Sequence, residues 1–302
     1  MMGAMQFQQL SYFVAVARTR HFTQAADLVG VAQPSLSKQI RVLENSLGTP
    51  LFVRHRSGIE LTSAGEALLP HAERILIDVE SARRAVHEVA GLQRGRVRLG
   101  ATPSLCDGLL PDVLTHFHEA HPDIELEVHE AGSRVLAREL AQGSLDLALL
   151  IAPREPFSDD IVATPVMRER LVLASPPGSD LPDEVDVADL QDVPLVMFRE
   201  GYDLRDVTLR AFEQAGVSPR LAVEGGEMSA VLRFVEVGLG HAVVPEMVMS
   251  NRPTLRSVRL RRPSLRREIA LAHRTETLQL AARAFQEDLL RQLGDFRPRA
   301  GT

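Results

Sequence analysis

The sequence is poor in the residues that mark secreted or membrane proteins. Of its 302 residues one is cysteine, Cys106, and none is tryptophan. A single cysteine excludes an intrachain disulfide and is typical of a reducing compartment. No apolar run approaches the roughly 20 residues that a membrane span needs. The N-terminus lacks the basic region and apolar stretch of a secretory signal. We therefore expect a cytoplasmic protein with no membrane contact.

Lysine is almost absent as well. Of the 34 basic residues 33 are arginine, and the one lysine is Lys38. Residues 1–94 hold 10 basic against 8 acidic residues, net +2, whereas residues 95–302 hold 24 against 32, net −8. Such asymmetry is typical of a nucleic-acid-binding module joined to an acidic remainder. The length predicts two or three compact units.

Three short helices are predicted in the first fifty residues. Apolar residues at helical spacing place the first helix over about 6–18. Thr23 can cap a second helix that ends near Val29. Pro34 suits the first turn of a third helix, which Gly48 ends.

The third helix has two contrasting faces. Its apolar stripe must pack against the other two helices and consists of Leu36, Ile40, Leu43 and Leu47. Its opposite face is short, polar and cationic and carries Pro34, Ser37, Lys38 and Arg41. Such a helix can enter a major groove and offer donors to base edges. A solvated helix face is the alternative, but three short helices joined by tight turns favour DNA.

Residues 51–61 predict a two-stranded wing. Segments 51–53 and 59–61 read as strands, and they flank a basic tip in which Ser57-Gly58 makes the turn. Arg54 and Arg56 at this tip are placed to follow phosphates or to enter a minor groove. The alternative is an ordinary surface hairpin.

The same residues resemble a known family. Four segments closely resemble the DNA-binding domain of LysR-type transcriptional regulators. They are Phe22-Thr-Gln-Ala-Ala-Asp-Leu, Val31-Ala-Gln-Pro-Ser-Leu-Ser-Lys-Gln-Ile-Arg-Val-Leu-Glu, Leu47-Gly-Thr-Pro-Leu-Phe-Val-Arg and Leu61-Thr-Ser-Ala-Gly. Gly30 departs from the larger polar residue of many relatives. The resemblance implies that the third helix faces the groove, with Arg54 in the wing and Thr23 near phosphate. The expected DNA-binding residues are Thr23, Gln33, Pro34, Ser35, Ser37, Lys38, Arg41, Arg54 and Arg56.

A long helix is predicted over 63–94, after a winged helix-turn-helix over 5–62. Thr62 can cap it, and Pro70 should kink or loosen its first turns. Its apolar residues are spaced 4-3-4-3-4-3, which is a heptad seam: Leu68, Ala72, Ile75, Val79, Ala82, Val86 and Val89. A narrow seam indicates a partner helix from a second protomer, although packing within the chain is the alternative. The resemblance favours dimerisation through Ile75, Val79, Ala82 and Val86, and it implies a tetramer built as a dimer of dimers.

Residues 95–302 alternate strand-like and helix-like runs, which predicts an α/β domain with mostly parallel sheets. Strands are expected near 96–99, 124–128, 145–151, 170–174, 194–198, 241–244 and 268–272. Helices are expected near 111–120, 133–142, 204–215, 228–237 and 278–293. This segment is also similar to the family's effector domain, which resembles two-lobed periplasmic binding proteins. The resemblance implies a first lobe over about 95–164 plus 271–302 and a second over about 165–270.

Ligands of such sheets bind beyond the carboxyl ends of the strands, near helix N-termini. Ser104 and Ser133 each fall where a strand gives way to a helix, and simple N-capping is the alternative role. By resemblance, the cleft is lined by Thr102, Ser104, Ser133, Met197, Phe198 and Arg199. Arg199 can pair with a ligand carboxylate, or with a surface acid of the chain itself. We expect a small effector that bears a carboxylate.

Three classes of function are compatible with this organisation. The first is an effector-responsive DNA-binding regulator, the second a solute-binding protein, and the third an α/β metabolic enzyme with a helical appendage. The helix-turn-helix argues against the second, and no nucleophile–base set or phosphate-binding motif supports the third. His116 and His118 point to nearly opposite faces of a helix, so they and His121 do not form a metal site. We expect a regulator with no catalytic residue, metal or cofactor.

Overall fold

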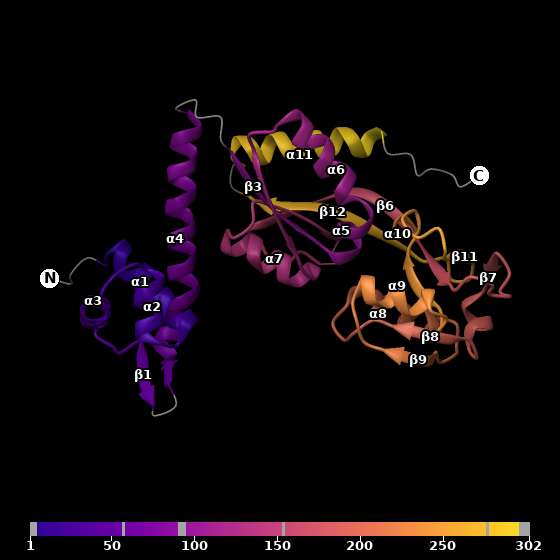
Figure 1. The fold of residues 1–302 in the computed structure, drawn as a ribbon, viewed down its shortest axis with the longest axis horizontal. Helices are drawn as coiled ribbons and strands as arrows, with labels where there is room; N and C mark the ends of the chain where they lie inside the picture. Colours follow the sequence, from indigo (N-terminus) through magenta and orange to yellow (C-terminus); the bar gives the residue numbers. More distant parts are fainter. Residues whose placement is uncertain (1–4, 56–57, 90–94, 153–154, 276–277, 296–302) are drawn as a thin grey trace. The chain divides into compact units, whose positions relative to one another are not determined.

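The computed structural model describes residues 5–55, 58–89, 95–152, 155–275 and 278–295. It divides into two compact units, residues 1–92 together with 142–144 and residues 93–141 together with 145–302 (Figure 1). No helix in the described part of the chain is long and apolar enough to cross a membrane.

Three helices form the core of the first unit. They are α1 (Phe7–Thr19), α2 (Phe22–Leu28) and α3 (Gln33–Leu47). The α3 prediction is confirmed: Pro34 lies in its first turn, and Gly48 ends it in the left-handed conformation, φ 71°. Leu36, Ile40 and Leu43 are buried as predicted, but the prediction for Leu47 is wrong. Leu47 is 38% exposed, because it is the last residue of the helix and lies beyond the neighbouring helices.

The second helix is capped by a residue other than the predicted one. Thr23 lies inside α2, and the N-cap is His21, whose Nδ1 accepts a hydrogen bond from the Thr23 backbone N–H at 3.2 Å. A histidine side chain can satisfy the free N–H groups of a helix start just as a hydroxyl does. Because Ser and Thr are the preferred N-cap residues, the sequence predicted the N-cap two residues after its true position.

The wing is held to α3 by one carboxylate. Strands β1 (Phe52–His55) and β2 (Gly58–Leu61) pair antiparallel, with Arg54 opposite Ile59 and His55 opposite Gly58. Both strands are longer than predicted, so Arg54 and Gly58 belong to strands instead of the tip. Glu44 of α3 accepts hydrogen bonds from the backbone N–H groups of Leu51, at 2.9 Å, and Phe52, at 3.4 Å.

Helix α4 (Ser63–Val89) follows the wing directly. Thr62 caps it, as predicted, by accepting from the Gly65 backbone N–H at 3.1 Å. Gly65 has no room for a side chain, because an added Cβ would lie 2.3 Å from the carbonyl oxygen of Leu51. Pro70 lies inside the helix, which is assigned without a break.

The start of the predicted heptad seam on α4 packs against the first unit's own core. Its first residues pack inside the unit: Ala72 is fully buried and Leu68 is partly buried in the same core as α1. Arg18 of α1 also pairs with Glu73 at 3.0 Å. Further along the helix Ile75 is 36% exposed. The alternative of packing within the chain therefore applies to the start of the seam.

The second unit has two lobes with separate cores (Figure 1). Lobe I contains the parallel strands β3 (Arg96–Ala101), β4 (Glu125–Glu130) and β5 (Leu147–Ile151). Its helices are α5 (Pro103–Gly108), α6 (Leu110–Ala120), α7 (Ser133–Gln142) and α11 (Leu280–Asp295). Lobe II contains β7 (Glu184–Val185), β8 (Pro194–Met197), β9 (Arg220–Glu224), β10 (Ala242–Pro245), β11 (Arg256–Leu260), α8 (Asp203–Gln214), α9 (Met228–Glu236), α10 (Glu246–Met249) and the short 3-10 helix η1 (Val187–Leu190).

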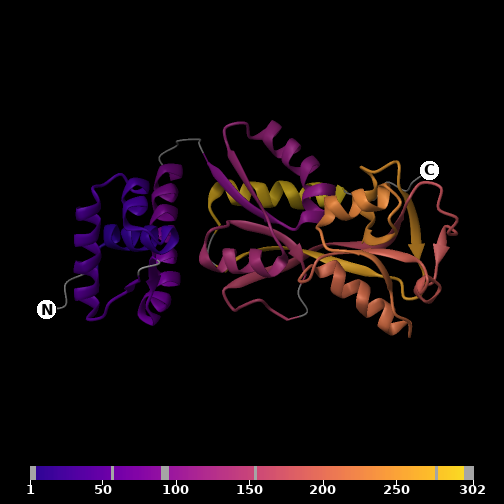
Figure 2. The same ribbon diagram turned by 60° about the horizontal axis from the view of Figure 1, so that its bottom comes forward.

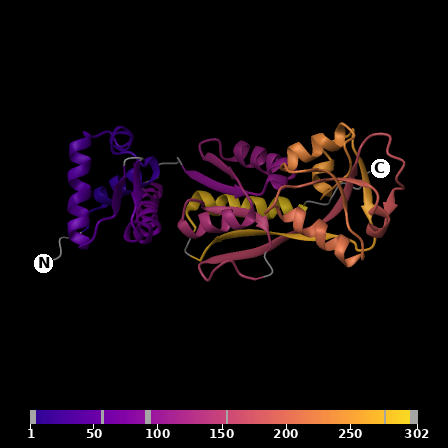
Figure 3. The ribbon, with the colours of Figure 1, turned by 90° about the horizontal axis from the view of Figure 1, so that it is seen from below.

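Two long strands, β6 (Ile161–Ser175) and β12 (Arg266–Arg274), connect the lobes (Figures 2 and 3). They pair antiparallel along the whole of β12, with an irregularity between Ile269 and Ala270. In lobe I β12 also pairs with β5, and in lobe II β6 pairs with β10 and β11. Strand β6 therefore pairs with strands of both lobes, and β12 joins it to β5 of lobe I.

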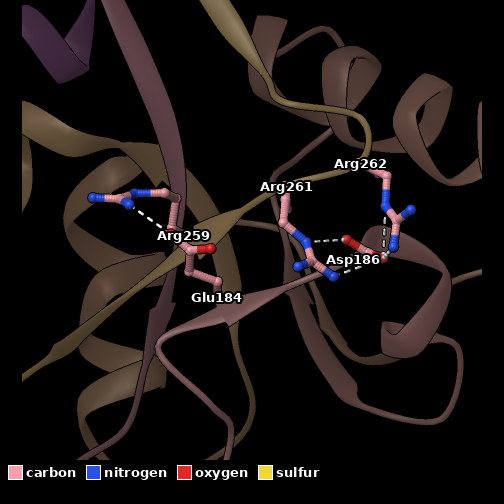
Figure 4. A network of polar contacts seen from close by, with 5 residues as sticks. All are labelled: Glu184, Asp186, Arg259, Arg261 and Arg262. Carbon is pink, nitrogen blue, oxygen red and sulfur yellow. Dashed lines mark hydrogen bonds and ion pairs between the residues drawn. The ribbon is translucent and has the colours of Figure 1, made fainter.

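The far edge of lobe II carries a network of surface ion pairs (Figure 4). Arg259 pairs with Glu184 at 2.5 Å, and Arg261 and Arg262 both donate to Asp186, at 2.9 and 3.0 Å. These hydrogen bonds hold the pKa of Asp186 well below its usual range. The network connects β7 to β11, and we assign it a structural role.

Removal of the Glu44 carboxylate should loosen the start of the wing. In Glu44→Ala, the backbone N–H groups of Leu51 and Phe52 lose their acceptor, at a cost of about 1–3 kcal/mol. Glu44→Gln keeps one side-chain oxygen as an acceptor and should lose less. Hydrogen exchange of these two amides measures the effect, which we expect to be faster in Glu44→Ala. Equal exchange in wild type and Glu44→Ala would show that Glu44 does not hold the wing.

Candidate nucleic-acid interface and ligand site

The outer face of α3 carries the polar residues that the sequence singled out. Pro34, Ser35, Lys38 and Arg41 are exposed. Among the described residues nothing forms a hydrogen bond or ion pair with the Lys38 or Arg41 side chain, so both cations are available to an external anion. Gln33 donates to Ser37 Oγ at 2.9 Å, which orients both side chains on this face.

Three predicted DNA contacts lie outside α3. Thr23 is exposed at the start of α2. Arg54 belongs to strand β1 of the wing. Arg56 lies outside the described residues. Within the described part of the wing, His55 Nε2 lies 3.7 Å from Glu60 Oε2 across the two strands.

The predicted dimerisation residues lie along α4. Ile75 and Ala82 are exposed and Val79 is half-buried, which leaves apolar surface uncovered beyond the start of the helix. Val86 lies one heptad beyond Val79 in the same helix.

In the second unit, two of the predicted ligand residues lie beside a buried ion pair. Arg267 of β12 pairs with Glu169 of β6, and both are at least nine-tenths buried. The Nη2 of Arg267 also donates to Ser104 Oγ at 2.8 Å. Ser104 belongs to α5 and is 1% exposed, and Thr102 caps the same helix at 4% exposure. Ser104 is therefore part of a polar cluster between strands and helix, and not only a residue at a helix start.

Ser133 connects the two lobes. Its Oγ accepts from the Ile151 backbone N–H at 3.2 Å and donates to the carboxylate of Asp203 at 3.0 Å. Ser133 is the first residue of α7 in lobe I, and Asp203 is the first residue of α8 in lobe II. A second contact joins the lobes at the end of α5, where Arg252 lies 3.4 Å from Asp107.

The predictions for Met197 and Phe198 as cleft-lining side chains are wrong. Both are 1% exposed, and Phe198 is part of the lobe II core, stacked on Tyr202 with ring centroids 4.6 Å apart. Met197 is the last residue of β8, whose side chains are buried on both faces, and Phe198 directly follows it. Arg199 is exposed, and its Nη2 lies 2.6 Å from the Glu227 carboxylate. The alternative weighed for Arg199, a salt bridge within the chain, is thus the one that the structure shows.

Charges from both lobes meet around Tyr202. Burial raises the pKa of its phenol; Arg267 opposes the rise, and the carboxylates of Glu227, Glu130 and Asp203 add to it. Tyr202 is 7% exposed and directly precedes α8. The next residue, Asp203, bonds to Ser133 of lobe I, so Tyr202 lies beside a contact between the two lobes.

Cys106 is a protonated thiol. Burial raises its pKa to about 12, and the charge and hydrogen bond of Glu130 and the charge of Asp107 add to the rise. The thiol donates a long hydrogen bond, 3.8 Å, to the carbonyl oxygen of Ala101. A thiol in this state is a poor nucleophile and a poor metal ligand. Among the described residues no group of three His, Cys, Asp or Glu side chains is arranged to hold a metal ion.

The sequence analysis missed Arg267, Glu169, Tyr202 and Asp203. The sequence did carry a signal for Glu169 and Arg267. Each lies in a run of three charged residues at the start of a predicted apolar strand, Arg168-Glu169-Arg170 and Arg266-Arg267-Glu268. Charged residues at strand ends are usually solvated, so this signal does not separate a buried pair from a surface one. Only the pairing of β6 with β12 brings the two together.

Comparison with known protein families covers nearly the whole chain. Residues 7–66 match the family described as "Bacterial regulatory helix-turn-helix protein, lysR family", and residues 90–294 match "LysR substrate binding domain". The chain belongs to the LysR family. A relative from Mycobacterium avium, described as "Probable hydrogen peroxide-inducible genes activator", is 34% identical over 89% of this chain and 88% of its own length. The regulator IlvR of Caulobacter vibrioides is 31% identical over 80% of this chain and 82% of its own length.

Solved structures show the same fold. The LysR family regulator CbnR has a TM-score of 0.73 at 26% identity, over 96% of this chain and 99% of its own. A second CbnR structure, in complex with its target DNA, has a TM-score of 0.72 at 27% identity, over 96% of this chain and 100% of its own. The predicted fold class and the interpretation as a LysR-type DNA-binding transcriptional regulator with an effector-binding domain are confirmed.

The raised pKa of Cys106 predicts slow alkylation in this LysR-family chain. A rise from 9.0 to about 12 lowers the thiolate fraction at pH 8 by on the order of a thousandfold. Iodoacetamide should therefore modify the native protein far more slowly than the same protein in urea, which serves as the control. Mass spectrometry follows the reaction. Similar rates in the native and unfolded protein would contradict the burial of this thiol.

Proposed function

We propose that α3 enters the DNA major groove and that the wing contacts the neighbouring backbone. The proposed contacts on α3 are Gln33, Pro34, Ser35, Ser37, Lys38 and Arg41, and those outside it are Thr23, Arg54 and Arg56. The observation that carries the proposal is the pair of exposed cations on α3, Lys38 and Arg41, with no partner among the described residues. Free cations of this kind are suited to base edges and phosphates. CbnR, a similar structure, is known in complex with its target DNA.

We propose further that the protein works as a cytoplasmic homo-oligomer and not as an enzyme. The exposed Ile75 and Ala82 and the half-buried Val79 of α4 support a dimer contact through the proposed residues Ile75, Val79, Ala82 and Val86, and a dimer of dimers would reach two half-sites on one DNA face. The proposed divisions are a DNA-binding domain over 5–62, a linker over 63–94 and an effector domain over 95–302. Within the last, lobe one takes 95–164 and 271–302, and lobe two takes 165–270. The irregularity of the β6–β12 pairing at Ile269 supports that boundary.

The effector site is proposed between the two lobes, around Thr102, Ser104 and Ser133. The hydrogen bond from buried Arg267 to Ser104, two residues after Thr102, supports a small effector that bears a carboxylate. Ser133 bonded to Asp203 is a contact that a ligand could replace or reinforce. An effector that prefers one arrangement of the lobes would shift the population of DNA-binding states. We no longer assign ligand contacts to the side chains of Met197 and Phe198, and Arg199 would have to leave Glu227 to make one.

Peroxide sensing is a second candidate, because the relative from Mycobacterium avium is described as a probable activator of hydrogen peroxide-inducible genes. Oxidation by peroxide starts from an accessible thiolate. The one cysteine of this chain is half-buried and has a raised pKa, and it has no second cysteine to form a disulfide. The candidate therefore receives no support from this chain, and a small-molecule effector is favoured.

The roles of α3 and the wing predict two different DNA-binding defects. Genome-wide footprinting first identifies the operator. Lys38→Ala should lose roughly 1–3 kcal/mol of discrimination at one base pair. Arg54→Ala should weaken specific and non-specific DNA alike and reduce the salt slope by about 1. Footprints of both variants over a salt series separate these outcomes. Wild-type sequence preference in Lys38→Ala would refute the base contact.

The linker proposal predicts that Val79→Asp disrupts the oligomer. The substitution would bury an unpaired carboxylate in the helix–helix contact, which is strongly unfavourable. Glu66→Gln changes an exposed residue of α4 off the seam and is the matched control. Analytical ultracentrifugation should give smaller species for Val79→Asp only. If both variants sediment like wild type, α4 is not the dimer contact.

A further inference from the structure

Several buried polar side-chain atoms in the second unit have no hydrogen-bond partner among the described residues. Three of them belong to neighbours of the effector site proposed above: Thr102 Oγ1, Glu169 Oε2 and Tyr202 Oη. Their residues are 4%, 9% and 7% exposed. Buried polar groups are almost always satisfied in folded proteins, so each such atom needs an explanation. These three atoms come from the turn before α5, from β6 and from the residue before α8.

The three residues are grouped around Arg267. This guanidinium is bonded to Glu169 and to Ser104, which lies two residues after Thr102. Its charge also acts on the phenol of Tyr202. The cluster therefore offers a cation and hydroxyl donors together with a carboxylate oxygen in need of a donor.

The charge around this cluster is negative. Glu130, Asp203 and Glu227 act on the phenol of Tyr202, and Glu246 acts on the carboxylate of Glu169. With Glu169 itself these are five acids, and two of them pair with arginines. Both arginines already have acidic partners, Arg267 with Glu169 and Arg199 with Glu227. A ligand that brings only a carboxylate adds a like charge here, whereas one that also brings a cation is attracted.

We propose that the effector is a zwitterion of the α-amino acid class. Its carboxylate accepts from Arg267 and from the hydroxyls of Thr102 and Tyr202. Its ammonium group donates to the free oxygen of Glu169 and faces Glu130, which is exposed at the carboxyl end of β4. The assignment rests on the proposed interlobe effector site and names the chemistry that this site takes.

Matched ligands test the proposal on the full-length protein. Each of the common amino acids is compared, at equal millimolar concentration, with the acid that lacks its amino group and with the amine that lacks its carboxylate. For leucine these are 4-methylpentanoate and 3-methylbutylamine. We expect one or more amino acids to raise Tm and to alter the operator footprint, while their two analogues do neither. If an acid without an amino group acts as strongly, or if no amino acid raises Tm, the proposal is wrong.

Two variants identify the groups that discriminate. Glu130→Gln should reduce the preference for the amino acid over its deaminated analogue, and Thr102→Val should weaken both alike. Glu119→Gln, an exposed acid on α6, is the control and should change nothing. An unchanged preference in Glu130→Gln would refute the role of that carboxylate in selecting the ammonium group.

These outcomes distinguish a failure of the amino-acid assignment from a failure of the proposed regulator function. A deaminated acid that alters the footprint preserves effector sensing and overturns only the amino-acid assignment. An operator footprint that no ligand of the panel alters, with Tm also unchanged, overturns the amino-acid assignment and leaves DNA binding intact. Loss of operator binding in the wild-type protein would contradict the regulator itself.

Discussion

The pairing of β6 with β12 is the constraint on which the second unit depends. Each strand runs through both lobes, so any relative movement of the lobes must pass through this ladder. The irregularity between Ile269 and Ala270 interrupts the regular register near the middle of β12. Irregular pairing of this kind bends a ladder and increases its twist. The irregularity therefore marks the place in the ladder where a change in the angle between the lobes would require the least loss of regular pairing.

A buried ion pair lies on this ladder. Removing Arg267 and Glu169 from water is expensive, and a buried pair adds little net stability compared with apolar residues of similar size. The pair is better explained by what it holds in place: it orients a cation toward Ser104 of α5 and leaves one carboxylate oxygen free. Two further contacts, Ser133 with Asp203 and Asp107 with Arg252, also join the lobes in the arrangement that the structure shows. If a ligand binds this arrangement of the lobes more tightly than it binds a second arrangement, the population of the first arrangement rises. The size of the rise is set by the difference between the two affinities.

Local features of the sequence predicted local features of the structure. Pro34 and Gly48 gave the limits of α3, and Thr62 gave the start of α4, because caps and proline act within one helical turn. Side-chain packing and the pairing of residues far apart in the sequence could not be predicted from such local features. Leu47 and Ala72 follow the same periodicities as their neighbours, yet one is exposed and the other is buried within the unit. Glu169 and Arg267 lie 98 residues apart, and no spacing rule connects them.

We propose that the buried pair of Arg267 and Glu169 serves ligand sensing and not folding or DNA binding. The double variant Arg267→Met/Glu169→Met removes both charges and fills the same space, so the fold should survive. Operator footprinting of this variant, with and without a ligand to which the wild-type protein responds, tests the claim most directly. The account predicts a wild-type footprint without ligand and no change when ligand is added. A ligand response equal to that of the wild type, or loss of the footprint in a folded variant, would contradict it.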